Sequence, residues 1–173
     1  FAAFEKLHKS GIKVNLNVFG APRFAFDLAV ISELKQLSKK ANLEKYVNAR
    51  CQRISPYERV KLCNESDVVL FPYASSIEGV IDPPLTLLEA MSCASTVVAA
   101  NALSVSWVLK NGENGWLCPS NSAENLYSFL KEALNSQEKI RIGNKARNTI
   151  QQNFSYKEIS TRLTKLYERV YLK

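Results

Sequence analysis

The feature that most constrains the fold of this chain is an alternation of strand-like and helix-like hydrophobic patterns. Residues 12–19 alternate polar and apolar side chains with a period of two and end at the turn Gly20-Ala21-Pro22. Residues 67–73 form an apolar run, D-V-V-L-F-P-Y, of the kind that is buried on both faces of a parallel sheet. Between these segments, apolar residues recur at helical spacing at positions 28, 31, 34 and 37. Short links between such segments favour right-handed crossovers, so we predict an α/β fold with a parallel sheet covered by helices on both faces.

The same patterns divide the rest of the chain into elements. Further strands are expected near residues 46–50, 96–100 and 115–117, and helices at 1–10, 55–64, 84–92 and 105–109. Ser55-Pro56-Tyr57-Glu58 has the order of a capping box with proline at the first helical position. From Ala123 onward three helices are expected, at 123–134, 137–152 and 155–171. The 173 residues therefore read as a single domain (1–173) with a C-terminal helical extension (123–173).

The basic charge of the chain is concentrated in that extension. The net charge is +7, and from Lys131 to the end ten Lys or Arg residues stand against four Glu residues. One interpretation is a solvated face of the C-terminal helices, and the other is a patch that meets anionic lipid headgroups or a phosphorylated substrate. Nucleic acid is not expected as a partner, because the basic residues are not combined with an aromatic platform or a recognised motif.

Several kinds of site are excluded by the residue inventory. The four cysteines form no C-x-x-C pair, so we expect reduced thiols rather than a zinc or redox motif. With His8 as the single histidine there can be no cluster of histidine ligands, and nothing around His8 suggests a Ser-His-Asp triad. The sequence has neither a long apolar span nor a signal peptide, which predicts a cytoplasmic location.

The rule for parallel sheets places ligands beyond the carboxyl ends of the strands. It brings residues 20–24, 51–55, 73–84 and 101–106 around one crevice. A helix is expected to begin there near Pro83 or Pro84, and helix N-termini suit phosphate groups. Proline has no N–H, so Leu85 and Thr86 would offer the first amides, with Asp82 either a plain N-cap or a functional acid.

Glu89 is the most distinctive residue of this helix. Its neighbours Leu87, Leu88, Ala90 and Met91 are apolar, so its carboxylate lies near a core and needs a partner. A structural salt bridge would satisfy it, and so would the adjacent hydroxyls of a ribose. If the helix began at Asp82, the two acids would lie two turns apart on one side.

Here the residues resemble a known family. The segment S-x-x-E-G-x-x-x-P-P-L-T-L-L-E-A-M-S-C-A-S-T-V-V-A resembles the signature of the group 1 (family 4) glycosyltransferases, roughly E-P-F-G-L-x-L-L-E-A-M-A-C-G-T-P-V-V-A. Residues 64–72 resemble the family's "y-x-x-A-D-v-f-v-f-P-S", residues 111–117 its "d-G-e-n-G-l-l", and residues 153–156 its "x-F-S-W". The resemblance covers nearly the whole chain.

The resemblance implies the C-terminal, Rossmann-like half of a GT-B fold, the half that holds the nucleotide-sugar donor. It implies that the family's first strand, its cationic loop and the N-terminal acceptor domain are absent from these residues. It makes Glu89 the ribose ligand and Asp82, or else Glu78, the acid facing the donor sugar. Pro84, Leu85 and Thr86 would lie on the phosphate side, and Arg53 and Ile54 in the loop that selects the base.

The activity implied is that of a retaining hexosyltransferase that moves a sugar from a UDP- or GDP-sugar to a glycan or lipid-linked acceptor, with the fragment alone inactive. No metal and no cofactor are implied. The expected partners are the donor, the N-terminal domain and an anionic membrane surface, the last placing the protein at the inner membrane face. The alternative is a catalytically degenerate nucleotide-sugar-binding or scaffolding module. It is suggested by the spacing of the acids before Glu89, which differs from the family's, and by Ala94 and the loop at residues 101–104, which stand where the family has glycines.

Overall fold

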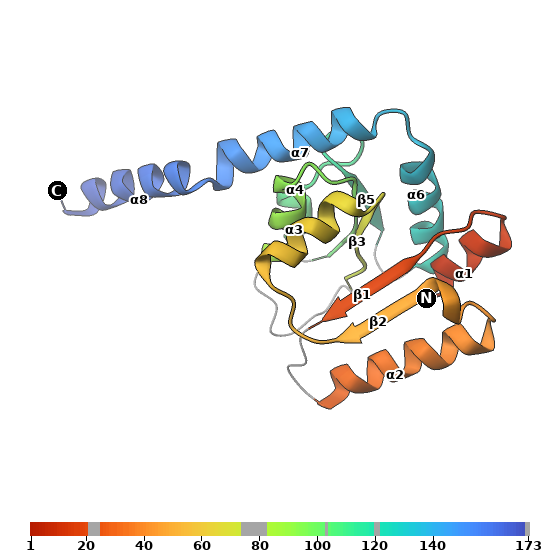
Figure 1. Cartoon of the computed structure of the whole chain (residues 1–173). Coiled ribbons are helices and arrows are strands. Elements are labelled where there is room, and N and C mark those ends of the chain that lie inside the picture. The colour runs from red at the N-terminus through yellow and green to blue at the C-terminus, as the bar shows by residue number, and fades with distance from the viewer. Residues whose placement is uncertain (21–24, 74–82, 103, 120–121, 172–173) are drawn as a thin grey trace.

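The structure, a computed structural model, describes residues 1–20, 25–73, 83–102, 104–119 and 122–171. It confirms the α/β class with parallel strands and a C-terminal helical extension (Figure 1). The strands are β1 (Leu16–Gly20), β2 (Val47–Cys51), β3 (Val69–Phe71), β4 (Val97–Asn101) and β5 (Trp116–Pro119). The helices are α1 (Ala2–Lys9), α2 (Ala25–Lys40), the 3-10 turn η1 (Glu44–Tyr46), α3 (Pro56–Glu65), α4 (Leu85–Ser92), α5 (Val105–Val108), α6 (Ala123–Asn135), α7 (Lys139–Phe154) and α8 (Tyr156–Tyr171).

The strands pair within two parallel sheets rather than one. β1 pairs with β2, from Leu16 opposite Val47 to Gly20 opposite Cys51. The second sheet has the order β3-β4-β5, with Val69 opposite Val97 and Val98 opposite Trp116. Among the described residues no ladder joins β1 to β3. In Figure 1 the two sheets lie next to each other, with α2 outside the first and α3 and α4 beside the second.

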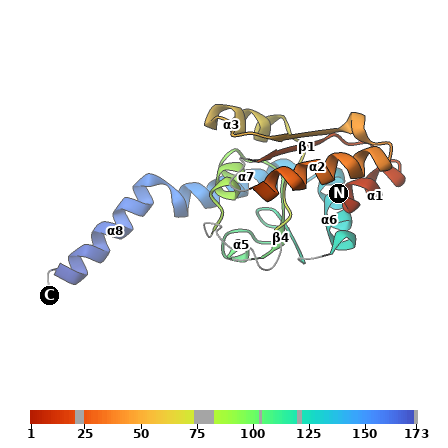
Figure 2. The same ribbon diagram turned by 90° about the horizontal axis from the view of Figure 1, so that it is seen from below.

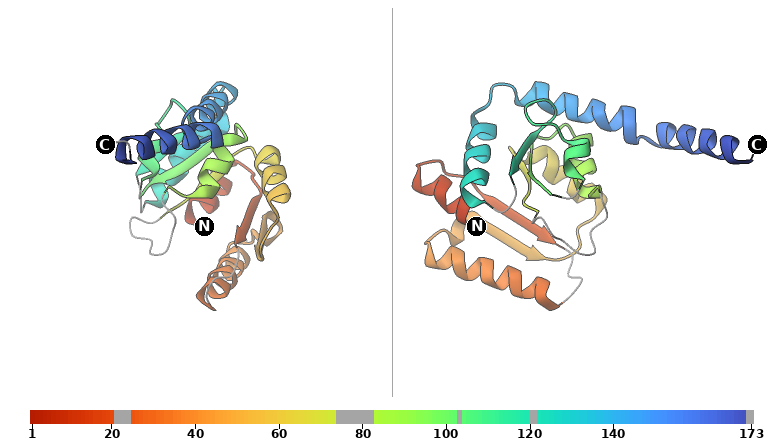
Figure 3. Two further views of the ribbon diagram at one scale, coloured as in Figure 1. Left: turned by 90° about the vertical axis from the view of Figure 1, so that its left-hand side faces the viewer. Right: turned by 180° about the vertical axis from the view of Figure 1, so that it is seen from behind.

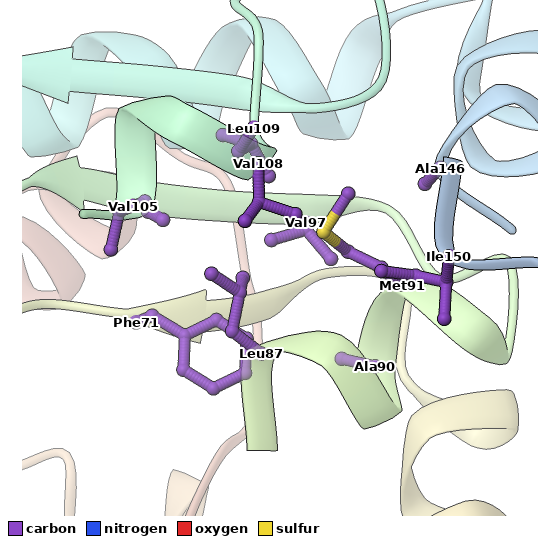
Figure 4. Close-up of a cluster of buried hydrophobic side chains, with 11 residues drawn as sticks. Phe71, Leu87, Ala90, Met91, Val97, Val105, Val108, Leu109, Ala146 and Ile150 are labelled. Carbon is purple, nitrogen blue, oxygen red and sulfur yellow. The ribbon is translucent and has the colours of Figure 1, made fainter. Parts of the chain in front are cut away.

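The second sheet is covered on both faces, as its apolar strands require. Val97 belongs to a core cluster that contains residues of α4, α5 and α7, whereas Val98 belongs to another that contains residues of α1 and α6. The same alternation holds on β3, where Phe71 and Leu70 face opposite clusters. Figure 4 shows the first cluster, in which Leu87 lies beside Phe71 and Met91 lies beside Ile150 of α7. Side chains that alternate with a period of two thus hold the helices of both faces.

The last helix stands apart from this body. No residue of α8 is buried, and Figures 1 and 2 show α8 projecting beyond the body of the molecule. The right view of Figure 3, seen from behind, shows the same projection, with the C-terminus far from the sheets. Its exposed large apolar residues recur at helical spacing, at Ile159, Leu163, Leu166 and Val170. Because α8 buries none of its apolar face within the described chain, that face is available to another surface.

Candidate functional site

The predicted site residues come from two elements next to each other. Arg53 and Ile54 lie in the loop between β2 and α3, and Pro84, Leu85, Thr86 and Glu89 lie on or just before α4. Helices α3 and α4 contact each other, so the loop side and the helix side of the predicted site belong to one surface (Figure 1). Asp82 and Glu78 fall outside the described residues, and their proposed roles stay predictions.

Helix α4 begins close to the predicted start near Pro83 or Pro84. The N-cap is Pro84, in an extended conformation (φ −61°, ψ 123°), and the helix begins at Leu85. The physical reason is the proline pair, since a residue that precedes a proline is disfavoured in the helical region. The N-cap position considered for Asp82 is therefore occupied by Pro84, and Asp82 itself lies outside the described residues.

The N-terminus of α4 still offers backbone donors on an accessible surface. No side chain of the described residues caps it, and among those residues the first helical amide with a backbone acceptor is that of Leu87, which donates to the Pro84 carbonyl at 3.0 Å. Leu85 and Thr86 are exposed, whereas Pro84 is buried. Burial raises the pKa of Tyr73, and a hydrogen bond with the Thr86 side chain opposes that rise.

Glu89 has a specific partner, Arg59 of α3. The Arg59 guanidinium donates from Nε to Oε2 at 2.9 Å and from Nη2 to Oε1 at 3.0 Å. This is the bidentate, side-on arrangement in which both carboxylate oxygens are held in the plane of the guanidinium. The Glu89 side chain nevertheless keeps 43% of its surface exposed. The salt bridge that the sequence left open is therefore real, and the carboxylate remains accessible to a ligand.

Arg59 also reaches the loop that contains Ile54. Its Nη1 donates to the Ile54 carbonyl at 3.1 Å, so one side chain binds both the loop and the carboxylate. The hydrogen bond to Glu89 raises the pKa of Arg59, which keeps the guanidinium charged. Arg53, by contrast, is exposed.

Helix α4 ends in a Schellman motif centred on Ala94. The Ser95 amide donates to the Ala90 carbonyl at 3.2 Å and the Ala94 amide to the Met91 carbonyl at 3.0 Å, the two bonds that define the motif. Ala94 has the left-handed φ of +59° that this position requires. Gly143 of α7 lies against it, since a Cβ at Gly143 would stand 2.1 Å from the Ala94 oxygen.

The motif at residues 111–115 has a structural role. The buried side chain of Asn114 accepts from the Lys110 amide at 2.7 Å and donates to the Val108 carbonyl at 3.0 Å and the Thr149 hydroxyl at 3.1 Å. It thereby ties the turn before β5 to α5 and α7. Gly115 is required there because a Cβ would stand 2.6 Å from Leu109 Cδ1.

Other kinds of site find no support in the part of the chain that the structure describes. The cysteines are free thiols, of which Cys118 is buried and three are partly buried. No three His, Cys, Asp or Glu residues come together there in a way that could hold a metal ion. The surface hollows beside His8 and Tyr46 and beside Tyr127 contain none of the predicted site residues.

The order of elements and the α4 segment can now be compared with known proteins. A family model described as "Glycosyl transferases group 1" matches residues 1–153. The chain belongs to this family. The fold, the motif order and the resemblance identified from the sequence agree with this membership.

Individual relatives of this group 1 glycosyltransferase chain are distant. WcaL of Salmonella typhimurium, whose name describes a colanic acid biosynthesis glycosyltransferase, is 23% identical over 97% of this chain. The sucrose-phosphate synthase tll1590 of Thermosynechococcus elongatus superposes over 99% of the chain with a TM-score of 0.77 and 20% identity. The C-terminal domain of LpcC from Francisella tularensis superposes over 90% of the chain and 77% of that domain, with a TM-score of 0.74 and 20% identity.

These relatives are longer than this chain, and another solved structure contains a bound nucleotide. The chain spans 40% of WcaL and 42% of the sucrose-phosphate synthase, so it corresponds to less than half of each. HepE of Anabaena was solved in complex with UDP and glucose, and it superposes over 97% of this chain and 52% of its own, with a TM-score of 0.72 and 18% identity. These structures establish the shared fold of this group 1 domain.

Arg59 was not predicted from the sequence. The Glu89 carboxylate was expected to need a partner, but no residue was named for it, although right-handed crossovers on both sides of β3 place α3 next to α4. The basic residues of α3 were the signal that could have found it.

Proposed function

We propose that this chain is the donor-binding half of a retaining hexosyltransferase. In the complete protein it transfers a sugar from a UDP- or GDP-sugar to a glycan or lipid-linked acceptor. The observation that carries the proposal is the accessible Glu89 carboxylate, fixed by Arg59 one helical turn after the N-terminus of α4. Residues four apart lie on one face of a helix, so Leu85 and Glu89 form a phosphate end and a ribose end of one surface.

Each residue has a defined task in this arrangement. The amides of Leu85 and Thr86 at the positive end of α4 would receive the diphosphate, whose negative charge grows as the sugar leaves. Glu89 would accept hydrogen bonds from the ribose, and the backbone at Arg53 and Ile54 would read the base. Asp82, or else Glu78, would contact the sugar. In this reading the donor phosphate, rather than a side-chain base, helps to take the proton of the acceptor.

The first test is calorimetric titration of the full-length protein with UDP, GDP and ADP. One diphosphate should bind saturably, and Glu89→Gln should weaken that binding about tenfold or more, because a hydrogen bond to a charged group contributes about 1.5–3 kcal/mol. Glu65→Gln is the matched control, since Glu65 is an exposed carboxylate of α3 that pairs with Lys61. Equal affinities of wild type and Glu89→Gln would contradict the role of Glu89.

The proposal includes a strand and an acceptor domain outside this chain. The division of the strands into two parallel sheets supports a further strand between β1 and β3, which would join them. In the complete protein we expect amide hydrogen exchange in β1 and β3 to be much slower than in the 173-residue chain. Equal exchange in both proteins would contradict the inserted strand.

A membrane surface is the second proposed partner. The exposed apolar face of α8 is flanked by Arg162, Lys165 and Arg169, a composition that suits an anionic interface. Within the described chain no helix has the length and hydropathy needed to cross a membrane. Co-sedimentation with phosphatidylglycerol vesicles should fall with added salt and with Gln at these three positions, but not with Gln at Lys35, Lys39 and Lys40 of α2. Binding that is insensitive to salt would contradict this proposal.

A scaffolding module without catalysis is the second candidate function. It is favoured by the altered spacing of the acids before Glu89 and by the absence of glycine at position 94 and in the loop at residues 101–104, where the family resemblance expects it. Transfer or hydrolysis of the bound nucleotide sugar by the full-length protein decides between the two candidates. Binding without turnover, in the presence of the acceptor pool of the source cell, would favour the module.

A further inference from the structure

Arg59 connects two parts of the proposed donor site that the sequence separates. It lies on α3, five residues after Ile54 and thirty before Glu89, and donates hydrogen bonds to both. Its three donating nitrogens, Nε, Nη1 and Nη2, belong to one planar, rigid group. The position of the Glu89 carboxylate relative to the Ile54 loop is therefore set by a single side chain.

A purely structural role does not account well for this pair. The Arg59 and Glu89 side chains keep 30% and 43% of their surface exposed. Accessible ion pairs usually contribute little to folding, because water screens them and their side chains lose freedom on pairing. What the bidentate geometry does provide is a fixed orientation for both carboxylate oxygens.

The oriented carboxylate still has room for a ligand. An ionised carboxylate has about four acceptor positions, and Arg59 takes one on each oxygen. One oxygen can then accept from each of two adjacent hydroxyl groups. The 2′- and 3′-hydroxyls of a ribose form such a pair, and a 2′-deoxyribose lacks one member of it.

We propose that Arg59 is a positioning residue that makes this site select ribonucleotides over 2′-deoxyribonucleotides. It holds the Glu89 carboxylate so that both oxygens face the diol, and it holds the Ile54 loop at a fixed distance from that carboxylate. The inference rests on the proposed function, since it assumes that a nucleoside diphosphate binds at α4. It adds a residue and a form of selectivity that the function alone does not require.

The experiment compares ribo and deoxy ligands in variants of the full-length protein. UDP, GDP and ADP are titrated first, followed by the 2′-deoxy form of whichever binds most tightly. The wild type should prefer the ribo form by about tenfold or more, the value of one hydrogen bond to a charged acceptor. Arg59→Lys keeps the positive charge but loses the planar guanidinium that makes two parallel hydrogen bonds. In this variant the preference for the ribo form should fall below about threefold, with most of the loss in affinity for the ribo form.

Three controls separate positioning from other effects. Lys61→Gln removes a cation from the same helix that pairs with Glu65 instead, and it should leave the ribo preference unchanged. Arg59→Gln should reproduce the loss seen with Arg59→Lys, and the thermal unfolding of each variant shows that it is folded. In a Glu89→Gln background, Arg59→Lys should change the preference no further, because the two residues act as one unit.

The possible outcomes distinguish this inference from the function beneath it. If a diphosphate binds and both folded Arg59 variants keep the wild-type ribo preference, the role of Arg59 is overturned while the donor site stands. A loss of affinity that is equal for the ribo and deoxy forms also overturns it. If the wild type binds none of the three diphosphates, the proposed function fails and this inference fails with it.

Discussion

Ala94→Gly should stabilise the protein, although substitution of alanine by glycine usually lowers the stability of a folded chain. Ala94 occupies the left-handed position of the Schellman motif that ends α4, with φ of +59°. A residue with a Cβ costs about 1–2 kcal/mol in this conformation. Glycine removes that cost, but it has more backbone freedom to lose on folding, about 0.5–1 kcal/mol. The substitution also removes a half-buried methyl group, so the expected net gain in the free energy of unfolding is about 0.5 kcal/mol.

The same substitution elsewhere in the chain provides a control of opposite sign. Ala29 is exposed within α2, where glycine should cost about 1 kcal/mol. The two Ala→Gly variants should therefore differ by about 1.5 kcal/mol, which is roughly 0.7 M in the midpoint of urea unfolding at a slope of about 2 kcal/mol per M. Trp116 is 1% exposed and lies in one of the two core clusters, so its fluorescence reports unfolding of this domain.

A loss of stability in Ala94→Gly comparable with that in Ala29→Gly would contradict the predicted gain. Such a result would mean that the backbone at Ala94 is not strained by its side chain. A change in the slope of unfolding, rather than in its midpoint, would instead indicate that the unfolded state or the two-state behaviour had changed.

Three further predictions concern the packing around the site. Gly143→Ala should lower stability by at least about 2 kcal/mol in the same urea assay, since its Cβ would meet the Ala94 oxygen at 2.1 Å; an unchanged midpoint would contradict the close crossing of α4 and α7. Asn114→Ala should cost about 2 kcal/mol because it removes the partner of the Lys110 amide and of the buried Val108 carbonyl, and a midpoint within error of wild type would refute this. Burial raises the pKa of the Cys63 and Cys118 thiols. At pH 8 both thiols should therefore react with iodoacetamide more slowly than free cysteine, as measured by mass spectrometry. The free energy of unfolding should also fall as the pH rises through the thiol range, because the folded state holds these protons more tightly than the unfolded state. Reaction of either thiol at the rate of free cysteine would contradict that shift.

The order and type of the elements could be predicted because the local signals are strong. The Ser55-Pro56 start of α3 is an example, since the Ser55 hydroxyl accepts from the Glu58 amide at 3.1 Å as the capping pattern requires. The apolar runs of β3 and β4 likewise became strands buried on both faces. The short η1 turn before β2 was not predicted, because it follows from the chain connection rather than from a hydrophobic period.

The geometry of the site was harder to predict because it depends on contacts between distant segments. The identity of Arg59 as the partner of Glu89 requires knowing which side of α3 faces α4, and the pattern of α3 is only weakly amphipathic. The start of α4 was predicted to within one residue, whereas Asp82 as a possible cap was suggested by residue type alone and the cap is Pro84. The division of the sheet depends on pairing, which the residues of a single strand do not encode.

The structure also changes how the loss of a family glycine at position 94 should be read. From the sequence, Ala94 counted against close approach of a ligand and so in favour of a module without catalysis. In the structure Ala94 follows the C-terminal end of α4, and the eight residues of that helix separate it from the N-terminus by about 12 Å. Its neighbour is Gly143 of α7, not the proposed phosphate surface. The absence of glycine here is therefore expected to reduce stability rather than donor binding. The catalytically degenerate alternative then depends on the loop at residues 101–104 and on the spacing of the acids before Glu89.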